Sequence, residues 1–112
     1  MLLRDRFLAY LGAYSAKDLQ LVSEMFADDI ALRDWKISVS GKDAAVAETD
    51  KNFKSADSVE IEVLHTYESK DAVAGELKIT VDRSEVLHVV DVVTYNAEGK
   101  IKSIRAYLGR ED

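Results

Sequence analysis

The hydrophobic pattern of this chain changes its dominant period close to residue 58. Before that point, apart from a short alternating stretch at residues 30–35, apolar residues recur every three or four positions, as on one face of a helix. From Val59 onward they recur every second position, as on one face of a strand. A chain in which helices are followed by strands is typical of an α+β fold, in which helices cover one face of an antiparallel sheet.

Three helices are expected before the change of period. A stripe of apolar residues predicts the first helix over residues 3–14. A short second helix follows, with Ser15 or Asp18 as its N-cap. Residues 44–53 contain no Gly or Pro and predict a third helix.

Five strands are expected, one of them between the second and third helices. Alternating residues predict strands over residues 30–35, 59–67, 73–81, 86–95 and 101–108. Gly75 lies inside the third of these strands and indicates a bulge or a bend. Since no linker or low-complexity tract interrupts the 112 residues, residues 1–112 are expected to form one domain.

The composition argues against several classes of function. A net charge of −6, with no basic cluster, disfavours nucleic-acid binding. Without Cys the chain has no disulfide or thiolate nucleophile, and its two His are not spaced as metal ligands. No apolar run approaches the ~20 residues that cross a bilayer, so no membrane partner is expected. Charged residues in "MLLRDRFLAYL" interrupt any export signal, and a cytoplasmic protein is expected.

One aspartate stands in the middle of the most apolar predicted strand, "LHVVDVVTY". Asp91 shares a face with Val89 and Val93, where an unpaired charge is costly. If Ile104 of the last strand lies opposite, the surroundings are apolar and favour the neutral acid. If the pairing is shifted by one residue, Arg105 lies opposite and forms an ion pair with Asp91. The hydrophobic pattern favours Ile104.

A second aspartate, Asp34, ends the strand in "FADDIALRDW" and shares a face with Ile30 and Leu32. A carboxylate at the edge of an apolar cavity can remove a proton from a carbon next to a carbonyl group. The alternative is structural, because an aspartate often closes a strand by accepting hydrogen bonds from turn amides.

The chain resembles the nuclear-transport-factor-2-like (NTF2-like) superfamily, and within it the ketosteroid isomerase and SnoaL-like branch. The segments "MFADDIALRDW" and "VVDVVTYNAEGKIKSIRAYLG" carry the resemblance, which covers nearly the whole chain. It implies a cone-shaped, strongly curved mixed or antiparallel sheet, with three helices from the N-terminal half on its concave face. This scaffold hosts isomerases, cyclases, dehydratases, epoxide hydrolases and binding proteins, so the resemblance specifies the fold better than the chemistry.

The resemblance also implies a catalytic site. Tyr10 stands where isomerases of this branch have a catalytic tyrosine, Asp34 where they have the general base, and Asp91 where they have a proton-donating aspartate. In that mechanism the tyrosine and the protonated aspartate form the oxyanion hole. Trp35 replaces the proline that usually follows the base, and the loop from Asp34 to Gly41 is shorter, so the same chemistry is compatible with a different substrate.

The expected pocket binds a small apolar molecule and needs no cofactor or metal. Beside the three catalytic positions, seven residues are expected to line it: Tyr14, Trp35, Phe53, His65, Val89, Ala106 and Leu108. Trp35 is expected either at the pocket mouth or at an interface. His65 follows the inward face of its strand, and histidines serve as polar pocket residues in the cyclase relatives.

The strand 86–95 is apolar on both faces, and only one of them meets the helices and the cavity. In this fold the other face is covered by the sheet of a second subunit, so a homodimer is expected.

Three functions are compatible with these residues. The first is a cofactor-free isomerase in which Asp34 is the base and Tyr10 and Asp91 are the oxyanion donors. The second is a binding module without catalysis. The third is a cyclase or hydrolase that uses Asp91 as acid or base, with His65 nearby. A shared cavity with Tyr10 and Asp91 within hydrogen-bond reach favours the first function, and a filled core favours the second.

Overall fold

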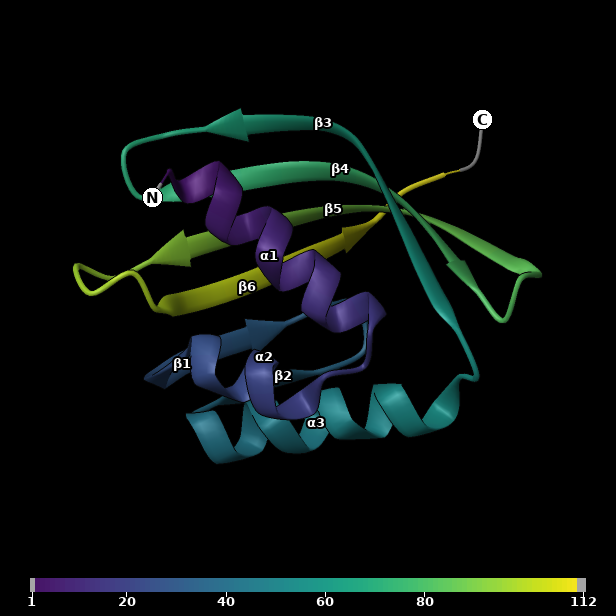
Figure 1. Ribbon diagram of the computed structural model, residues 1–112, viewed down its shortest axis with the longest axis horizontal. Coiled ribbons are helices and arrows are strands. Elements are labelled where there is room, and N and C mark those ends of the chain that lie inside the picture. The colour runs from purple at the N-terminus through teal and green to yellow at the C-terminus, as the bar shows by residue number, and fades with distance from the viewer. Residues whose placement is uncertain (1, 111–112) are drawn as a thin grey trace.

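The computed structural model describes residues 2–110, which form three helices and six strands (Figure 1). The helices are α1 (Leu3–Ser15), α2 (Leu19–Met25) and α3 (Lys42–Ser55). The strands are β1 (Phe26–Arg33), β2 (Ser38–Ser40), β3 (Val59–Glu68), β4 (Ala72–Val81), β5 (Glu85–Tyr95) and β6 (Ile101–Leu108). The predicted α+β class is confirmed.

The helix boundaries follow from local sequence. Asp18, and not Ser15, caps α2, because its carboxylate accepts a hydrogen bond from the amide of Leu21 at 3.1 Å. Gly41 has a φ of 91°, a conformation that favours glycine, and α3 begins directly after it. None of the helices within residues 2–110 is long and apolar enough to span a bilayer.

All six strands belong to one sheet, in the order β2-β1-β6-β5-β4-β3. Neighbouring strands are antiparallel except for β1 and β6, which run parallel, so the sheet is mixed, one of the two forms that the resemblance implies. The parallel pair is possible because most of the chain lies between the two strands as a long crossover. The short strand β2 was not expected, since two serines in three residues carry no hydrophobic alternation.

The sheet curves around α1, which crosses its concave face in front of β4, β5 and β6 (Figure 1). Gly75 permits this packing, because a Cβ atom built on it would lie 2.4 Å from Cζ of Phe7. The Phe7 ring therefore contacts the backbone of β4 directly. Gly75 itself pairs in register with Asp91, and the bulge expected there lies instead in β3, between Val63 and His65.

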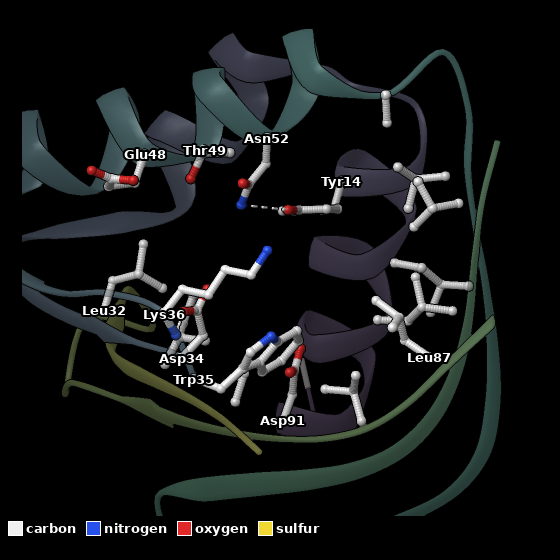
Figure 2. Close-up of a pocket in the computed structure, with 18 of the residues that line it drawn as sticks. Tyr14, Leu32, Asp34, Trp35, Lys36, Glu48, Thr49, Asn52, Leu87 and Asp91 are labelled. Atoms are coloured by element: carbon white, nitrogen blue, oxygen red, sulfur yellow. Dashed lines mark hydrogen bonds between the residues drawn. The ribbon is translucent and has the colours of Figure 1, made fainter. Parts of the chain in front are cut away.

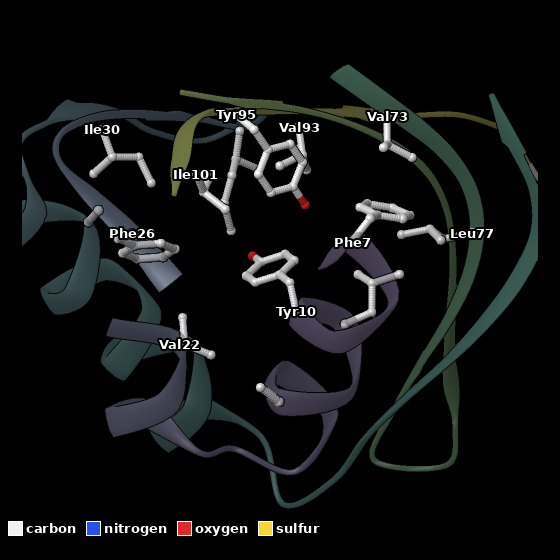
Figure 3. Packing of buried hydrophobic residues seen from close by; sticks show 14 of the residues in the cluster. Phe7, Tyr10, Val22, Phe26, Ile30, Val73, Leu77, Val93, Tyr95 and Ile101 are labelled. Carbon is white, nitrogen blue, oxygen red and sulfur yellow. The ribbon is translucent and has the colours of Figure 1, made fainter. Parts of the chain in front are cut away.

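Tightly packed side chains from the helices and the sheet form the core beside α1 (Figure 3). The largest fully buried side chains are Phe7, Val22, Phe26, Ile30, Val73, Leu77, Val93 and Ile101. Tyr10 also belongs to this cluster, and its ring lies 6.5 Å from that of Phe26. The core fixes α1 against the sheet and thereby positions the residues of α1 that reach the cavity described next.

Candidate active site

A cavity of about 270 Å³ opens between the helices and the concave face of the sheet (Figure 2). Its walls come from α1, the loop after β1, α3 and the inner faces of β3, β4, β5 and β6. Apolar side chains form much of the wall, among them Leu32, Ile61, Ile79, Leu87 and Ile104. Pockets that bind small organic ligands share this make-up of apolar walls with a few polar groups.

Seven of the ten residues predicted for the site line this cavity: Tyr10, Tyr14, Asp34, Trp35, Val89, Asp91 and Ala106. The three catalytic candidates therefore border one space, although they come from α1, the turn directly after β1 and the middle of β5. Residues 2–110 contain no group of three His, Asp or Glu side chains arranged to hold a metal ion.

Three residues predicted for the pocket lie outside it. Phe53 is buried behind Tyr14 and meets its ring edge to face, with ring centroids 4.9 Å apart. His65 is exposed, because the bulge just before it in β3 reverses the alternation of inward and outward side chains. Leu108 lies at the exposed end of β6 and is 46% exposed.

Asp91 lies between Gly75 of β4 and Ala106 of β6. It lines the cavity but is only 9% exposed, and its carboxyl group forms no hydrogen bond or ion pair within residues 2–110. Burial in this apolar setting, and to a smaller extent the negative charge of Asp34, raises the pKa of Asp91 to about 7. A large share of this carboxyl is therefore neutral near pH 7.

The pairing of β5 with β6 decides between the two environments considered for Asp91. Arg105 lies on the opposite face of the sheet, so the alternative of an Asp91–Arg105 ion pair is wrong. Ile104 shares the inner face with Asp91, as the apolar alternative requires, but the residue directly opposite is Ala106. The register shifts by one residue at the hairpin end of β5: pairing continued from Tyr95 and Ile101 would place Arg105 opposite Asp91, and the shift places Ala106 there instead.

The position of Asp34 is compatible with both roles that the sequence left open. Its Oδ1 atom accepts hydrogen bonds from the backbone amides of Lys36 at 2.7 Å and Ile37 at 2.9 Å, so it closes the turn after β1. Its Oδ2 atom accepts none within residues 2–110, and the side chain borders the cavity. The neighbouring Arg33 is directed elsewhere and donates a hydrogen bond to the Tyr107 hydroxyl at 2.8 Å. The turn thus holds the carboxylate and leaves one oxygen free.

Tyr10 lies on the buried stripe of α1 and is 5% exposed. Burial, followed by the charge of Asp91, raises the pKa of Tyr10 well above its ordinary value. Its hydroxyl group therefore keeps its proton at neutral pH and can donate a hydrogen bond. Tyr14 lies one turn further along α1, with its ring edge-on to Tyr10 at 6.1 Å.

Six polar residues of the cavity were not predicted: Lys36, Glu48, Thr49, Asn52, Ser55 and Glu85. The amide of Asn52 donates to the Tyr14 hydroxyl oxygen at 3.2 Å (Figure 2). The Thr49 hydroxyl donates to the carbonyl of Ala45 at 2.8 Å. Ala45, Thr49 and Asn52 are spaced four and three residues apart, and this helical spacing is the signal that places polar groups on the inner face of α3.

The family model of the SnoaL-like domain matches residues 7–104. The chain belongs to the SnoaL-like domain family. A comparison with curated proteins finds no match. The match to the family model confirms the predicted resemblance to the SnoaL-like branch.

Solved structures place this SnoaL-like protein in the NTF2-like fold. SalBIII, an epoxide hydrolase/cyclase-like enzyme of pyran ring formation in salinomycin, aligns with a TM-score of 0.83 and 24% identity, over 96% of this chain and 90% of its own. An NTF2-like protein from Cytophaga hutchinsonii aligns with a TM-score of 0.82 and 13% identity, over 97% of this chain and 91% of its own. A candidate ketosteroid isomerase from Kribbella flavida aligns with a TM-score of 0.78 and 11% identity, over 92% of this chain and 74% of its own. At these identities the similarity shows the fold alone.

Proposed function

We propose that this SnoaL-like protein is an isomerase that moves a proton within a small carbonyl compound without a cofactor. The observation that carries the proposal is the presence of two unlike carboxyl groups beside one apolar cavity. Asp91 is buried and has a pKa raised to about 7, whereas Asp34 is partly exposed and held by turn amides. Two carboxyl groups in such different environments suit a proton donor and a base.

Asp34 acts as the base in this proposal. Its free Oδ2 atom removes a proton from the carbon between the carbonyl group and the C=C bond of a β,γ-unsaturated ketone. The electron pair of the broken C–H bond moves toward the carbonyl oxygen and forms a dienolate. Asp34 then returns the proton to the γ carbon, which gives the conjugated ketone and restores the carboxylate.

Tyr10 and Asp91 act as hydrogen-bond donors to the dienolate oxygen. Both groups lie in a wall where little water competes, so their hydrogen bonds are stronger than they would be in solution. In other enzymes the loss of one such donor raises the barrier by roughly 2.7–4 kcal/mol. The activity depends on a protonated Asp91 and should therefore decline as pH rises above about 7.

The same pair of carboxyl groups supports a second candidate, the opening of an epoxide by water or by a hydroxyl group of the substrate. The observation that favours it is the protonated state of Asp91, which would supply a proton to the epoxide oxygen while Asp34 activates the nucleophile. SalBIII, a protein of the same fold, is described as epoxide hydrolase/cyclase-like. His65 has no part in this candidate because it is exposed outside the cavity.

Turnover of two substrate panels distinguishes these candidates. With β,γ-unsaturated ketones, the ultraviolet absorbance of the conjugated product should appear with the wild type. Asp34→Asn should lower this rate by about 10²- to 10⁴-fold while the fold is kept. Asp28→Asn is the matched control, because Asp28 is an exposed carboxylate of β1 outside the cavity, and its rate should equal that of the wild type.

The other outcomes each select a different function. Turnover of small epoxides alone would favour the hydrolase or cyclase. Ligand binding without turnover of either panel would favour a binding module. Full activity of Asp34→Asn would show that Asp34 is not the base.

A further inference from the structure

The cavity has a second polar region, on the side of α3. In Figure 2 the side chains of Tyr14 and Asn52 lie on one side of the open space, while Asp34 and Asp91 lie on the other. The Lys36 side chain extends from the turn after β1 and points its ammonium group into the space between them (Figure 2). An apolar ligand with a single carbonyl group would leave this second region without a partner.

Tyr14 and Asn52 each have one hydrogen-bond donor left for a ligand. The Tyr14 oxygen already accepts a hydrogen bond from Asn52 at 3.2 Å, so its own O–H is directed elsewhere. Burial raises the pKa of Tyr14, which keeps that proton in place at neutral pH. Asn52 retains one further N–H and its carbonyl oxygen. Thr49 adds no free donor, because its hydroxyl hydrogen is given to Ala45.

Lys36 is the one cation among the described residues that line the cavity. Its ammonium group forms no hydrogen bond or ion pair within residues 2–110. Glu48, the acid of α3 that lines the cavity, is paired with Lys51 at 3.3 Å. The positive charge of Lys36 is therefore available to a ligand.

We propose that the ligand is a carbonyl compound that carries a carboxylate at its other end, bound by Lys36, Tyr14 and Asn52. The placement of the ligand's carbonyl end at Asp91 rests on the proposed function. A carboxylate accepts several hydrogen bonds and donates none, which matches a region that holds an ammonium group, a hydroxyl hydrogen and an amide hydrogen. Lys36 and Asn52 are exposed at the cavity mouth, so the carboxylate keeps part of its hydration while the apolar body of the ligand is buried.

Isothermal titration calorimetry with two matched compounds tests this proposal. The first is 4-acetylbenzoate, which has a ketone and a carboxylate on one ring, and the second is the neutral 4-acetylbenzamide. At pH about 6 the wild type should bind the carboxylate ~3- to 5-fold more tightly, the preference that one partly exposed ion pair supplies. Lys36→Met should abolish the preference, and Lys36→Arg should retain it. Trp35, the only tryptophan of the chain, lines the same cavity and provides a second, fluorescent readout.

The control variant is Lys70→Met, which removes the same charge from an exposed turn away from the cavity. It should keep the wild-type preference. Equal binding of the two compounds, binding of neither, or a preference that survives in Lys36→Met would overturn the proposal. The measurement needs no turnover, so a wild type that prefers the carboxylate but isomerises no ketone would reject the isomerase and keep this inference.

Discussion

Asp91 illustrates how backbone pairing sets the chemistry of one side chain. An aspartate between strands β4 and β6 meets Gly75 and Ala106, neither of which offers a charge or a side-chain hydrogen bond. Burial, with a smaller contribution from the negative charge of Asp34, therefore favours the neutral form of the carboxyl group. A shift of one residue in the pairing of β5 with β6 would have brought Arg105 to the same face and ionised the group.

The raised pKa of Asp91 predicts how stability depends on pH. The folded pKa is about 7, against the ~3.9 of an unfolded aspartate, so the native state holds a proton that the unfolded chain has released. The contribution of the Asp91 carboxyl group to the free energy of unfolding is fully present below pH about 4 and is lost as pH rises to about 7. The loss is on the order of 4 kcal/mol at most, from about three pKa units.

Asp91→Asn cannot ionise and should lose this dependence. Chemical denaturation at pH about 4.5 should show a small difference between the two proteins, and at pH about 7.5 the variant should be the more stable one. A variant that is clearly less stable than the wild type at the higher pH would show that ionised Asp91 has a stabilising partner, and its role as a neutral donor would be wrong.

The strands β3 and β4 show how one element positions another. The bulge before His65 changes which face of the sheet the later side chains of β3 point to. His65 and Tyr67 are therefore exposed, whereas Val63, before the bulge, is half-buried. Across from this half of β3, Gly75 leaves room for the Phe7 ring on the backbone of β4. The placement of α1, and with it Tyr10, depends on this contact.

Gly75→Ala should destabilise the fold by roughly 1–3 kcal/mol, the usual cost of overpacking a core. The added Cβ would lie 2.4 Å from the fully buried ring of Phe7, which has no space to retreat. Thermal or urea denaturation measures the loss, and Phe7→Leu in the same chain should restore part of it.

Gly12→Ala is the matched control for this substitution. Gly12 lies inside α1 with nothing within 4 Å of its added Cβ, so alanine should stabilise the helix by about 0.5–1 kcal/mol. If both glycine variants changed stability alike, the contact between Phe7 and β4 would not be the cause.

The outer face of the sheet bears on the assembly of the whole molecule. Val90 and Tyr107 pair across β5 and β6 on this face and are 38% and 47% exposed, beside the half-buried Val92. Apolar and aromatic side chains on a face that no helix covers are typical of an interface. A homodimer that joins the two sheets remains our prediction.

Sedimentation at micromolar concentration should therefore show a species of twice the 12.5 kDa chain mass. Val90→Glu should shift it toward the monomer, because the charge would be buried at the interface. Leu21→Glu introduces the same charge at a similarly exposed position on α2 and should leave the dimer intact. A wild type that sediments as a clean monomer would exclude the dimer.

Local periodicity was sufficient to predict most of the fold. Each of the three helices and five of the six strands were expected, because side-chain spacing within one segment reports which face is buried. Four of these strands agree with their observed bounds to within one residue, whereas β1 begins at Phe26 and not at residue 30. The isolated charge of Asp91 among apolar residues, the turn signal at Asp34 and the buried stripe of Tyr10 are also local, and all three residues border the cavity.

Only the tertiary structure decided what depends on contact between segments. The parallel pair of β1 and β6, the exposure of His65 and the partner of Asp91 follow from pairing registers, and one bulge reverses every later side chain of a strand without changing its composition. Lys36 and Asn52 read as ordinary polar residues in sequence, and they border the cavity because the turn after β1 and α3 converge at its mouth. Periodicity reports whether a side chain is buried, but the register of neighbouring strands determines what it is buried against.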